Sequence, residues 1–286
     1  MTTKYQSRLA DDFRQMHHRS PLLLLANAWD PMSARVFEAA GFGAIATTSG
    51  GVAWALGFPD GEKAPWQEVV AATARIVRCV RVPVTADIEG GYAASPAEVA
   101  RNVTDIIRAG AVGINLEDGT HRSDMPIRSL DDAVARIEAA RKAAQAEGVP
   151  LVINGRIDIY SKKVGAETTR FDETVRRGRA YLAAGADCIF PFGLSDLKVA
   201  ADLVEALGAP INIVGRRGMP DVAQLERMGI ARISTASGPS LVVMSTMRQI
   251  ADELHKGRFD VLDSVVTRAD AQAMFAARST DAERTA

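Results

Sequence analysis

The feature that most constrains the fold is a signal that occurs four times along the chain. Each time, a helical segment ends in Ala-Gly or Met-Gly and passes at once into a short apolar run. Glycine tolerates the left-handed conformation that ends many helices. Short uninterrupted apolar runs are typical of strands that are buried on both faces. The four glycines are Gly41, Gly110, Gly185 and Gly229.

Four further apolar runs complete the pattern, one at the start of the chain and three introduced by proline. Together they predict eight strands, each followed by a helical segment. Eight such units in 286 residues favour the α/β class and a closed parallel (β/α)8 TIM barrel over an open doubly wound sheet. No Gly-x-Gly-x-x-Gly follows the first strand, which argues against a dinucleotide-binding sheet. The strands are predicted to begin near Leu22, Ala44, Val84, Val112, Leu151, Ala186, Ile211 and Arg232.

Segments outside the eight units are also predicted to be helical. A helix from Lys4 to Met16 would cover the bottom of the barrel, and Pro31 to Ala40 forms a helix capped by Asp30. After the last strand, helices are expected from Ser240 to His255 and from Val261 to Ala276. The last one is not needed to close a barrel. Its apolar side predicts an oligomer interface, through Val265, Val266, Met274 and Phe275. The expected domains are a catalytic barrel, 1–258, and a C-terminal helix and tail, 259–286.

Composition narrows the range of partners. Lys and Arg together number 34 against 35 acidic residues, and no run of one sign stands out. A nucleic-acid surface or a polybasic membrane patch therefore has no support, and the expected partner is a small molecule. The two cysteines, Cys79 and Cys188, are far apart and are expected to be reduced and buried. No signal-peptide core and no apolar run of about 20 residues is present, so we expect a cytoplasmic protein.

Carboxylates follow the third and fourth predicted strands. Asp87 and Glu89 are two residues apart and should leave a strand on the same side, whereas Glu117 and Asp118 should point to opposite sides. Three acids, Asp87, Glu89 and Glu117, are therefore predicted to meet at one rim. Such an oxygen cluster suits a hard divalent cation such as Mg²⁺. The alternative is that these acids are solvated loop starts or helix caps.

Polar groups also follow the other strands. Backbone N–H groups of Ser49, Gly50 and Gly51 could bind a carboxylate or phosphonate, and Arg156 offers a two-pronged donor for the same anion. Asn212 ends the seventh strand. A metal facing anion donors suits a small 2-oxo or 2-hydroxy acid, whose enolate the metal would stabilise as a neighbouring bond breaks. The alternative for Arg156 is an ion pair with Glu117 or Asp158 that only braces the rim.

Five motifs, in this order, resemble the isocitrate lyase and phosphoenolpyruvate mutase superfamily over roughly residues 10–255. They are Asn27-Ala-Trp-Asp-Pro-Met-Ser-Ala-Arg35, Thr48-Ser-Gly-Gly-Val-Ala with Leu56-Gly-Phe-Pro-Asp60, Asp87-x-Glu89-x-Gly-Tyr92, Asn115-Leu-Glu-Asp118 and Asn154-Gly-Arg156.

The resemblance implies a (β/α)8 barrel that exchanges its eighth helix within a homodimer or a homotetramer. It also implies Mg²⁺, with Mn²⁺ as an alternative, held near Asp87, Glu89 and Glu117. Asp60 would be a further acid, Ser49 to Gly51 would bind the substrate carboxylate, and Arg156 would contact the substrate.

The loop after the fourth strand departs from this family. Its isocitrate and methylisocitrate lyases carry Lys-Lys-Cys-Gly-His there, but Gly119 to Arg128 contains no cysteine. Those lyases commonly have Glu where this chain has Phe192, and the phosphonate-handling members have Lys where it has Gly119. In this loop His121 and Arg122 are the candidates to replace those catalytic groups. His121 could act as general acid or base, and Arg122 could move onto a substrate anion. The alternative is a loop histidine exposed to water.

The preferred hypothesis is a Mg²⁺-dependent lyase that cleaves a C–C bond in a small 2-oxo or 2-hydroxy carboxylate through an enolate at the metal. The second hypothesis is P–C chemistry, as phosphonopyruvate hydrolase or phosphonomutase. The third is a barrel that binds a metabolite without turning it over.

Overall fold

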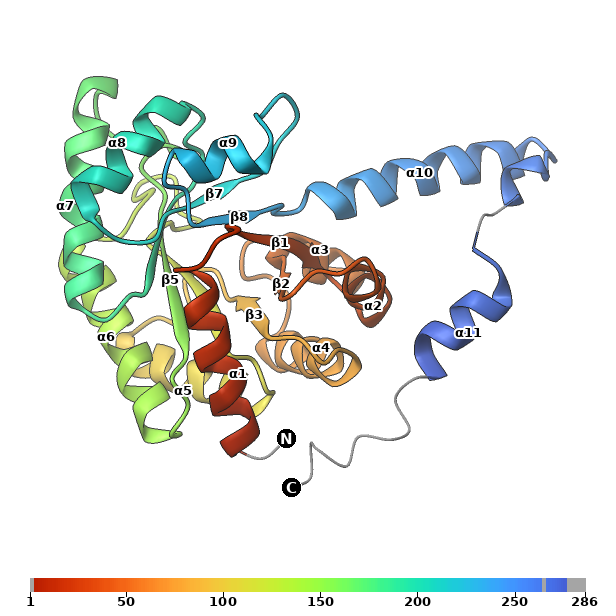
Figure 1. The fold of residues 1–286 in the computed structure, drawn as a ribbon, viewed down its shortest axis with the longest axis horizontal. Helices are drawn as coiled ribbons and strands as arrows, with labels where there is room; N and C mark the ends of the chain where they lie inside the picture. The colour runs from red at the N-terminus through yellow and green to blue at the C-terminus, as the bar shows by residue number, and fades with distance from the viewer. Residues whose placement is uncertain (1–2, 264–265, 277–286) are drawn as a thin grey trace.

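The computed structural model of the protein describes residues 3–263 and 266–276. All eight predicted strands are present, pair in parallel, and begin within two residues of the predicted starts. Their order around the sheet is β6-β5-β4-β3-β2-β1-β8-β7, and a bridge between Ile189 and Ile211 joins the two ends. The (β/α)8 barrel is therefore confirmed (Figure 1). The strands are β1 Leu23–Ala28, β2 Ile45–Thr47, β3 Val84–Asp87, β4 Gly113–Glu117, β5 Val152–Ile157, β6 Cys188–Pro191, β7 Asn212–Val214 and β8 Arg232–Ser234.

Helices surround the strands. In the sequence, α1 precedes the first strand, and α10 and α11 follow the last one. Their bounds are α1 Thr3–Met16, α2 Pro31–Ala39, α3 Ser49–Ala55, α4 Trp66–Cys79, α5 Pro96–Arg108, α6 Leu130–Ala146, α7 Arg170–Ala183, α8 Leu197–Leu207, α9 Val222–Arg227, α10 Gly238–His255 and α11 Arg268–Ala276. Two 3₁₀ turns, Glu167–Thr169 and Asp260–Leu262, complete the set.

Local signals that set the helix ends are confirmed. The four repeated glycines all have positive φ, from +81° at Gly229 to +108° at Gly185, which residues with a side chain rarely adopt. At the start of α2 the Asp30 side chain accepts a hydrogen bond from Ser33 N at 2.7 Å, and the Ser33 side chain closes the reciprocal contact. The glycines thus end helices ahead of the next strand, and the Asp30 cap starts α2 after β1, in each case through residues close in the chain.

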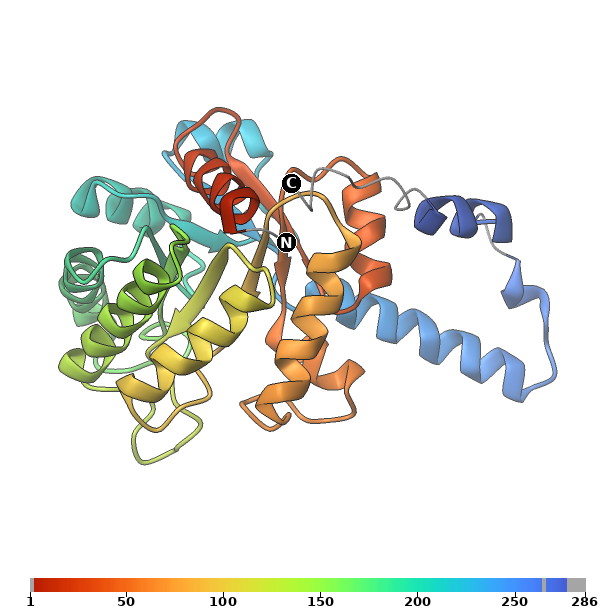
Figure 2. The ribbon, with the colours of Figure 1, turned by 90° about the horizontal axis from the view of Figure 1, so that it is seen from below.

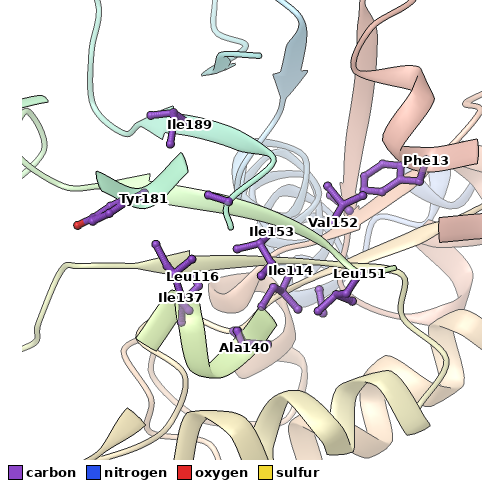
Figure 3. Packing of buried hydrophobic residues seen from close by; sticks show 14 of the residues in the cluster. Phe13, Ile114, Leu116, Ile137, Ala140, Leu151, Val152, Ile153, Tyr181 and Ile189 are labelled. Atoms are coloured by element: carbon purple, nitrogen blue, oxygen red, sulfur yellow. The ribbon is translucent and has the colours of Figure 1, made fainter. Parts of the chain in front are cut away.

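The barrel has an apolar outer layer and a polar interior. On β4, Ile114 and Leu116 face the helices and pack near Ile137 of α6 (Figure 3). The alternate residues, Asn115 and Glu117, point inward, because side chains of a strand alternate. Pairing places Asn115 opposite Asn154 and Glu117 opposite Arg156 on β5. Polar groups therefore stack in layers toward the carboxyl ends of the strands.

Helix α1 covers the bottom of the barrel, as predicted. Phe13 is fully buried, and a Cβ atom added at Gly113 would lie only 2.8 Å from its ring. The Gln6 side chain donates to the carbonyl oxygens of Ile107 at 2.7 Å and Ala111 at 2.9 Å. Glycine at the first position of β4 thus makes room for the ring.

The C-terminal part differs from the prediction. Helix α10 forms where expected but projects away from the barrel (Figures 1 and 2). A continuous helix from Val261 to Ala276 is wrong: a 3₁₀ turn ends at Leu262 and α11 begins at Arg268. The reason is a cap, since Thr267 Oγ1 accepts a hydrogen bond from Asp270 N at 3.1 Å and starts a new helix there. Val265 lies outside the described residues.

Two further sequence predictions concern the two cysteines and membrane-spanning helices. Cys79 and Cys188 are buried, as expected. Among the described helices none combines the length and the apolar character that crossing a membrane requires.

We predict that Phe13→Ala lowers the free energy of unfolding by about 3–5 kcal/mol, because truncating a buried aromatic ring leaves a cavity. Urea denaturation of the two proteins measures the difference. Met125→Ala is the control, since 38% of Met125 is exposed. An equal change in both variants would show that α1 does not contribute to the core.

Candidate active site

The carboxyl ends of the strands surround a cavity of about 110 Å³. Pockets for drug-sized ligands are usually at least about 300 Å³, so this one suits a molecule of few heavy atoms. Its wall combines acids, amides, hydroxyls, one arginine and two phenylalanines. The lining residues are Asn27, Thr48, Ser49, Asp60, Asp87, Asn115, Arg156, Phe190, Phe192, Ser234, Ala236 and Ser237.

Asp87 is the last residue of β3 and lines this cavity. Its Oδ2 accepts a hydrogen bond from Ser49 N at 3.2 Å, and its own N–H donates to Thr47 Oγ1 at 2.8 Å. Burial raises the pKa of Asp87, and the charge of Arg156 only partly offsets this effect. A charged Asp87 therefore needs more positive charge nearby than the described residues supply.

The Glu89 side chain also lies at the carboxyl end of the barrel, but its backbone conformation differs from the predicted strand. It lies beyond the end of β3, with φ +51°, so a turn and not strand alternation aims its side chain. Its Oε1 accepts from Glu62 N at 3.0 Å and from the Tyr92 hydroxyl at 3.1 Å, and its Oε2 lies 3.2 Å from His121 Nε2. Burial, followed by the charge of Asp87, raises the pKa of Glu89 to about 8.

Glu117 ends β4 and is 6% exposed. Its Oε2 lies 2.7 Å from Arg156 Nη1, yet no hydrogen bond of acceptable geometry reaches this oxygen. Burial raises the pKa of Glu117 well above the ordinary value; Arg156 opposes this shift, and Asp158 and Asp87 add to it. Its neighbour Asp118 points to the other side, as predicted, where Tyr181 and Arg177 bind its Oδ2 at 2.7 and 3.0 Å.

The acids fit a divalent cation. One ligand atom each of Glu89, Glu117 and His121 lies within 4.8 Å of the others. The pKa values of Asp87, Glu89 and Glu117 are all raised, and a bound cation would relieve this crowding of buried negative charge. Two of the three predicted ligands thus lie in one cluster. The structure adds His121 to that cluster, while Asp87 faces the adjoining cavity.

Arg156 forms the ion pairs considered for it and also lines the cavity, where its role as an anion donor stays a prediction. It lines the cavity, and its guanidinium pairs with Glu117 at 2.7 Å and Asp158 at 2.8 Å. Burial opposes its charge, but these two carboxylates outweigh that effect and raise the pKa of Arg156. The ring of Phe192 lies under the guanidinium at 3.7 Å. The arginine is therefore held in one orientation at the cavity wall.

Of the three predicted anion binders Ser49, Gly50 and Gly51, only Ser49 lines the cavity. Its N–H already donates to Asp87. A Cβ atom at Gly50 would lie 3.0 Å from Ser237 Oγ and 3.1 Å from Asp60 Oδ2, so glycine permits this close packing. Gly51 packs against Trp29, and neither glycine is among the lining residues.

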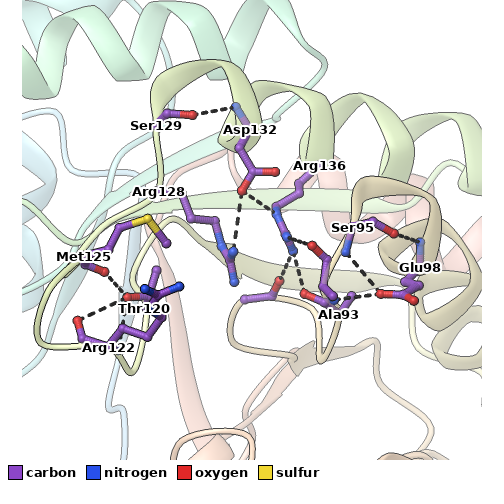
Figure 4. Close-up of polar contacts among 12 residues, drawn as sticks. Ala93, Ser95, Glu98, Thr120, Arg122, Met125, Arg128, Ser129, Asp132 and Arg136 are labelled. Atoms are coloured by element: carbon purple, nitrogen blue, oxygen red, sulfur yellow. Dashed lines mark hydrogen bonds and ion pairs between the residues drawn. The ribbon is translucent and has the colours of Figure 1, made fainter.

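Asn212 and Arg122 take positions away from the cavity wall. Asn212 is fully buried in the barrel, where its Nδ2 donates to Ser234 Oγ at 3.2 Å. Arg122 is exposed and pairs with Asp124 at 2.6 Å in the loop after β4. In the same loop the hydroxyl of Thr120 donates to the carbonyl of Met125 (Figure 4). His121 is the one substitute in this loop that contacts the acid cluster, through Glu89.

Arg136 was missed by the sequence analysis. This residue of α6 is 1% exposed, and its guanidinium donates to the carbonyl oxygens of Gly90, Ala93 and Ala94 at 3.1 Å each (Figure 4). These contacts brace the turn that carries Glu89. The signal was present, because a lone arginine on the apolar face between Ala133 and Ile137 needs buried acceptors.

Other polar lining residues were recognised near strand ends or in motifs but were assigned no role from the sequence. They come from four different segments: Asn27 from β1, Asn115 from the middle of β4, Ser234 from β8 and Ser237 from the start of α10. Neutral amides and hydroxyls at strand ends carry no signal of their own in a single sequence.

Comparisons with known proteins agree with this geometry. The sequence model of the family described as phosphoenolpyruvate phosphomutase matches residues 13–255. The chain belongs to the isocitrate lyase and phosphoenolpyruvate mutase superfamily. This superfamily includes lyases and mutases, and several relatives have names that give a small carboxylate as substrate: oxaloacetate, 2-methylisocitrate and isocitrate.

Three relatives illustrate its range. A Burkholderia cenocepacia J2315 protein classed with the phosphonomutases is 40% identical, with 86% of this chain and 99% of that chain covered and a TM-score of 0.81. An oxaloacetate decarboxylase of Ectopseudomonas mendocina is 32% identical, with 72% of this chain and 70% of the relative covered. The structure of an oxaloacetate acetylhydrolase with its product oxalate is 25% identical, covers 94% of each chain and has a TM-score of 0.82.

We predict that the metal-free protein loses stability as pH rises from about 4.5 to about 8. Folding raises the pKa of Glu89 to about 8 from an ordinary 4.5, so the folded state binds more protons than the unfolded state across that window. Asp87 and Glu117 act in the same direction. Melting temperatures in a chelator measure the slope, and Mg²⁺ should restore stability most near pH 8.

Glu89→Gln should flatten this slope, whereas Glu138→Gln, at an exposed position of α6, should not. Equal slopes in the wild type and in Glu89→Gln would contradict the assignment of a buried, crowded carboxylate.

Proposed function

We propose that the protein is a Mg²⁺-dependent lyase that cleaves a C–C bond in a small 2-oxo carboxylate, with decarboxylation of oxaloacetate as the reaction to test first. Mn²⁺ is the alternative metal. The observation that carries this proposal is the composition of the cavity wall. Its ionisable side chains are Asp60, Asp87 and Arg156, and the described lining residues include no Cys, His, Lys or Tyr.

With Asp87 assigned to the cation, Asp60 is the one carboxylate left as a base among the described lining residues, and this favours decarboxylation over cleavage of a 2-hydroxy acid. Cleavage of a hydroxy acid begins with removal of the hydroxyl proton, which requires a base. In oxaloacetate the bond between C3 and the C4 carboxylate breaks directly. Its electron pair moves toward the C2 carbonyl, CO₂ leaves, and the resulting enolate of pyruvate takes a proton at C3. A bound divalent cation would supply the positive charge that makes the carbonyl a better electron acceptor.

The chain's own residues have separate tasks in this reaction. Arg156, held by Glu117 and Asp158, would bind a substrate carboxylate. Phe190 and Phe192, whose rings are 5.4 Å apart, would exclude water from the reacting carbons. Glu89, Glu117 and Asp87 would hold the cation, with His121 beside it. His121 is also our candidate for the group that delivers the proton, and Asp60 would be a further acid at the mouth.

The relatives support this choice of substrate. Two of the three proteins compared above carry oxaloacetate in their names, and one contains oxalate. The 40% identity to a protein classed with the phosphonomutases supports P–C chemistry as the second candidate. Binding of a metabolite without turnover is the third.

We predict that the protein with Mg²⁺ releases pyruvate from oxaloacetate, and that Asp87→Asn lowers kcat/KM by at least about 100-fold because a cavity carboxylate is lost. Product analysis distinguishes pyruvate from oxalate plus acetate, and phosphonopyruvate, malates and citrates complete the substrate panel. Lys198→Glu, on the exposed face of α8, is the control. Unchanged activity in Asp87→Asn would overturn the metal assignment, and phosphate release from phosphonopyruvate alone would select P–C chemistry.

We also propose a homodimer or homotetramer in which α10 packs on a partner subunit, with residues 1–258 as the barrel domain and 259–286 as an extension. Helix α10 leaves several apolar side chains exposed, including Val242 at 66% and Met247 at 63%. Apolar cavities of about 630 and 590 Å³ lie along it against α2 and α3. Exposed apolar area of this extent is typical of a protein interface.

Replacing Val242 and Met247 by Glu should therefore convert the oligomer to a monomer, because two charges would be buried at the interface. Light scattering after size-exclusion chromatography measures the mass, with Lys198→Glu again as control. A monomeric wild type would refute the exchange of α10.

A further inference from the structure

Arg232 is a buried cation without a carboxylate partner in the described part of the chain. It begins β8 and is 0% exposed. Its Nη2 donates to Asn115 Oδ1 at 3.2 Å, its Nη1 lies 3.5 Å from His17 Nε2, and its Nε has no hydrogen-bond partner. Buried arginines are usually paired with acids, so this one needs an explanation.

The contacts hold the guanidinium firmly from below. His17 Nδ1 lies 2.9 Å from the Phe13 carbonyl oxygen and must carry the hydrogen there, which leaves Nε2 as an acceptor for Arg232. Burial lowers the pKa of His17 to about 3, so the ring is neutral and can accept. His17, the first residue after α1, therefore positions Arg232, and Arg232 in turn contacts Asn115.

Arg232 determines which way the Asn115 amide points. A guanidinium only donates hydrogen bonds, so the atom of Asn115 that faces it must be the oxygen. Asn154 Nδ2 donates to the same oxygen at 2.8 Å. With Oδ1 engaged twice, Nδ2 is turned away from both partners. Among the described residues none accepts a hydrogen bond from Nδ2, and Asn115 lines the cavity although it is only 5% exposed.

We infer that Asn115 is a substrate-orienting residue whose Nδ2 donates to an oxygen of the bound carboxylate, and that Arg232 is the positioning residue that keeps this donor turned into the cavity. The inference deepens the proposed function and rests on it. Pairing places Asn115 directly opposite Asp87 on β3, so the donor stands beside an acid of the cavity. A ligand must therefore place an oxygen acceptor next to Asn115 Nδ2. The 2-oxo acids and oxalate carry such oxygens.

Asn115→Asp tests the inference, with oxalate and Mg²⁺ as the probe and isothermal titration calorimetry as the measurement. Asp has the same shape but no donor, so oxalate should bind about 10- to 100-fold more weakly. The same change gives Arg232 a carboxylate, so the melting temperature should rise. If Asn115 had only a structural role, a substitution that raises the melting temperature would not also weaken oxalate binding.

A second variant removes the objection that Asp simply repels the anion. Asn115→Leu combined with Arg232→Met replaces the pair by neutral side chains of similar size, which should keep the fold intact. Oxalate binding should fall by at least about 10-fold, whereas Mn²⁺ binding without oxalate should stay within about twofold of the wild type. Arg232→Lys, which retains a donor toward Asn115, should keep most of the oxalate affinity.

Wild-type oxalate affinity in both Asn115 variants would overturn this inference and leave the proposed function standing. A wild-type protein that binds no oxalate in the presence of Mg²⁺ would overturn both.

Discussion

The structure depends on how buried negative charge is balanced at the carboxyl end of the barrel. Glu117 and Asp158 pair with one guanidinium, that of Arg156, whose charge also acts on Asp87, while Glu89 lies next to His121. Burial raises the pKa values of Asp87, Glu89 and Glu117, and the one positive charge of Arg156 offsets this effect only in part, at Asp87 and Glu117. A divalent cation is the simplest group that would complete the balance, and a dianionic substrate would then find both the cation and Arg156 in reach.

The scaffold around this charge is held by other arginines that take no part in the cavity wall. Arg136 binds three carbonyl oxygens of the turn that carries Glu89. Arg177 joins Asp118 to α7, which keeps the end of β4 in place on the outer side of the barrel. Arg232 acts from the interior, between α1 and Asn115. Each of these residues is charged, so each could be placed inside only because the tertiary structure offers acceptors in the required geometry.

Much of the fold could be predicted from the sequence because its signals are local. The glycines that end helices, the capping aspartate Asp30 and the short apolar runs act through neighbours in the chain, so eight strands were placed to within two residues. The prediction failed where a polar cap interrupts an apolar pattern, as Thr267 does at the start of α11. Glu89 lies at the predicted rim of the barrel. It is held there by a residue conformation of the left-handed region and not by the alternation of a strand, which was the predicted reason.

The amino-acid order by itself determined the barrel, its polar rim and the family, since periodicity, glycine caps and the acidic motifs are all written in consecutive residues. Only the tertiary structure decided which groups face one another. His121 lies next to Glu89, and Arg156 pairs with both Glu117 and Asp158. Arg232 donates to Asn115 and so turns its amide toward the cavity. The physical reason is distance. Hydrogen bonds and ion pairs act over a few ångströms, here between residues up to 117 positions apart, and a linear pattern does not show which side chains will meet at such distances.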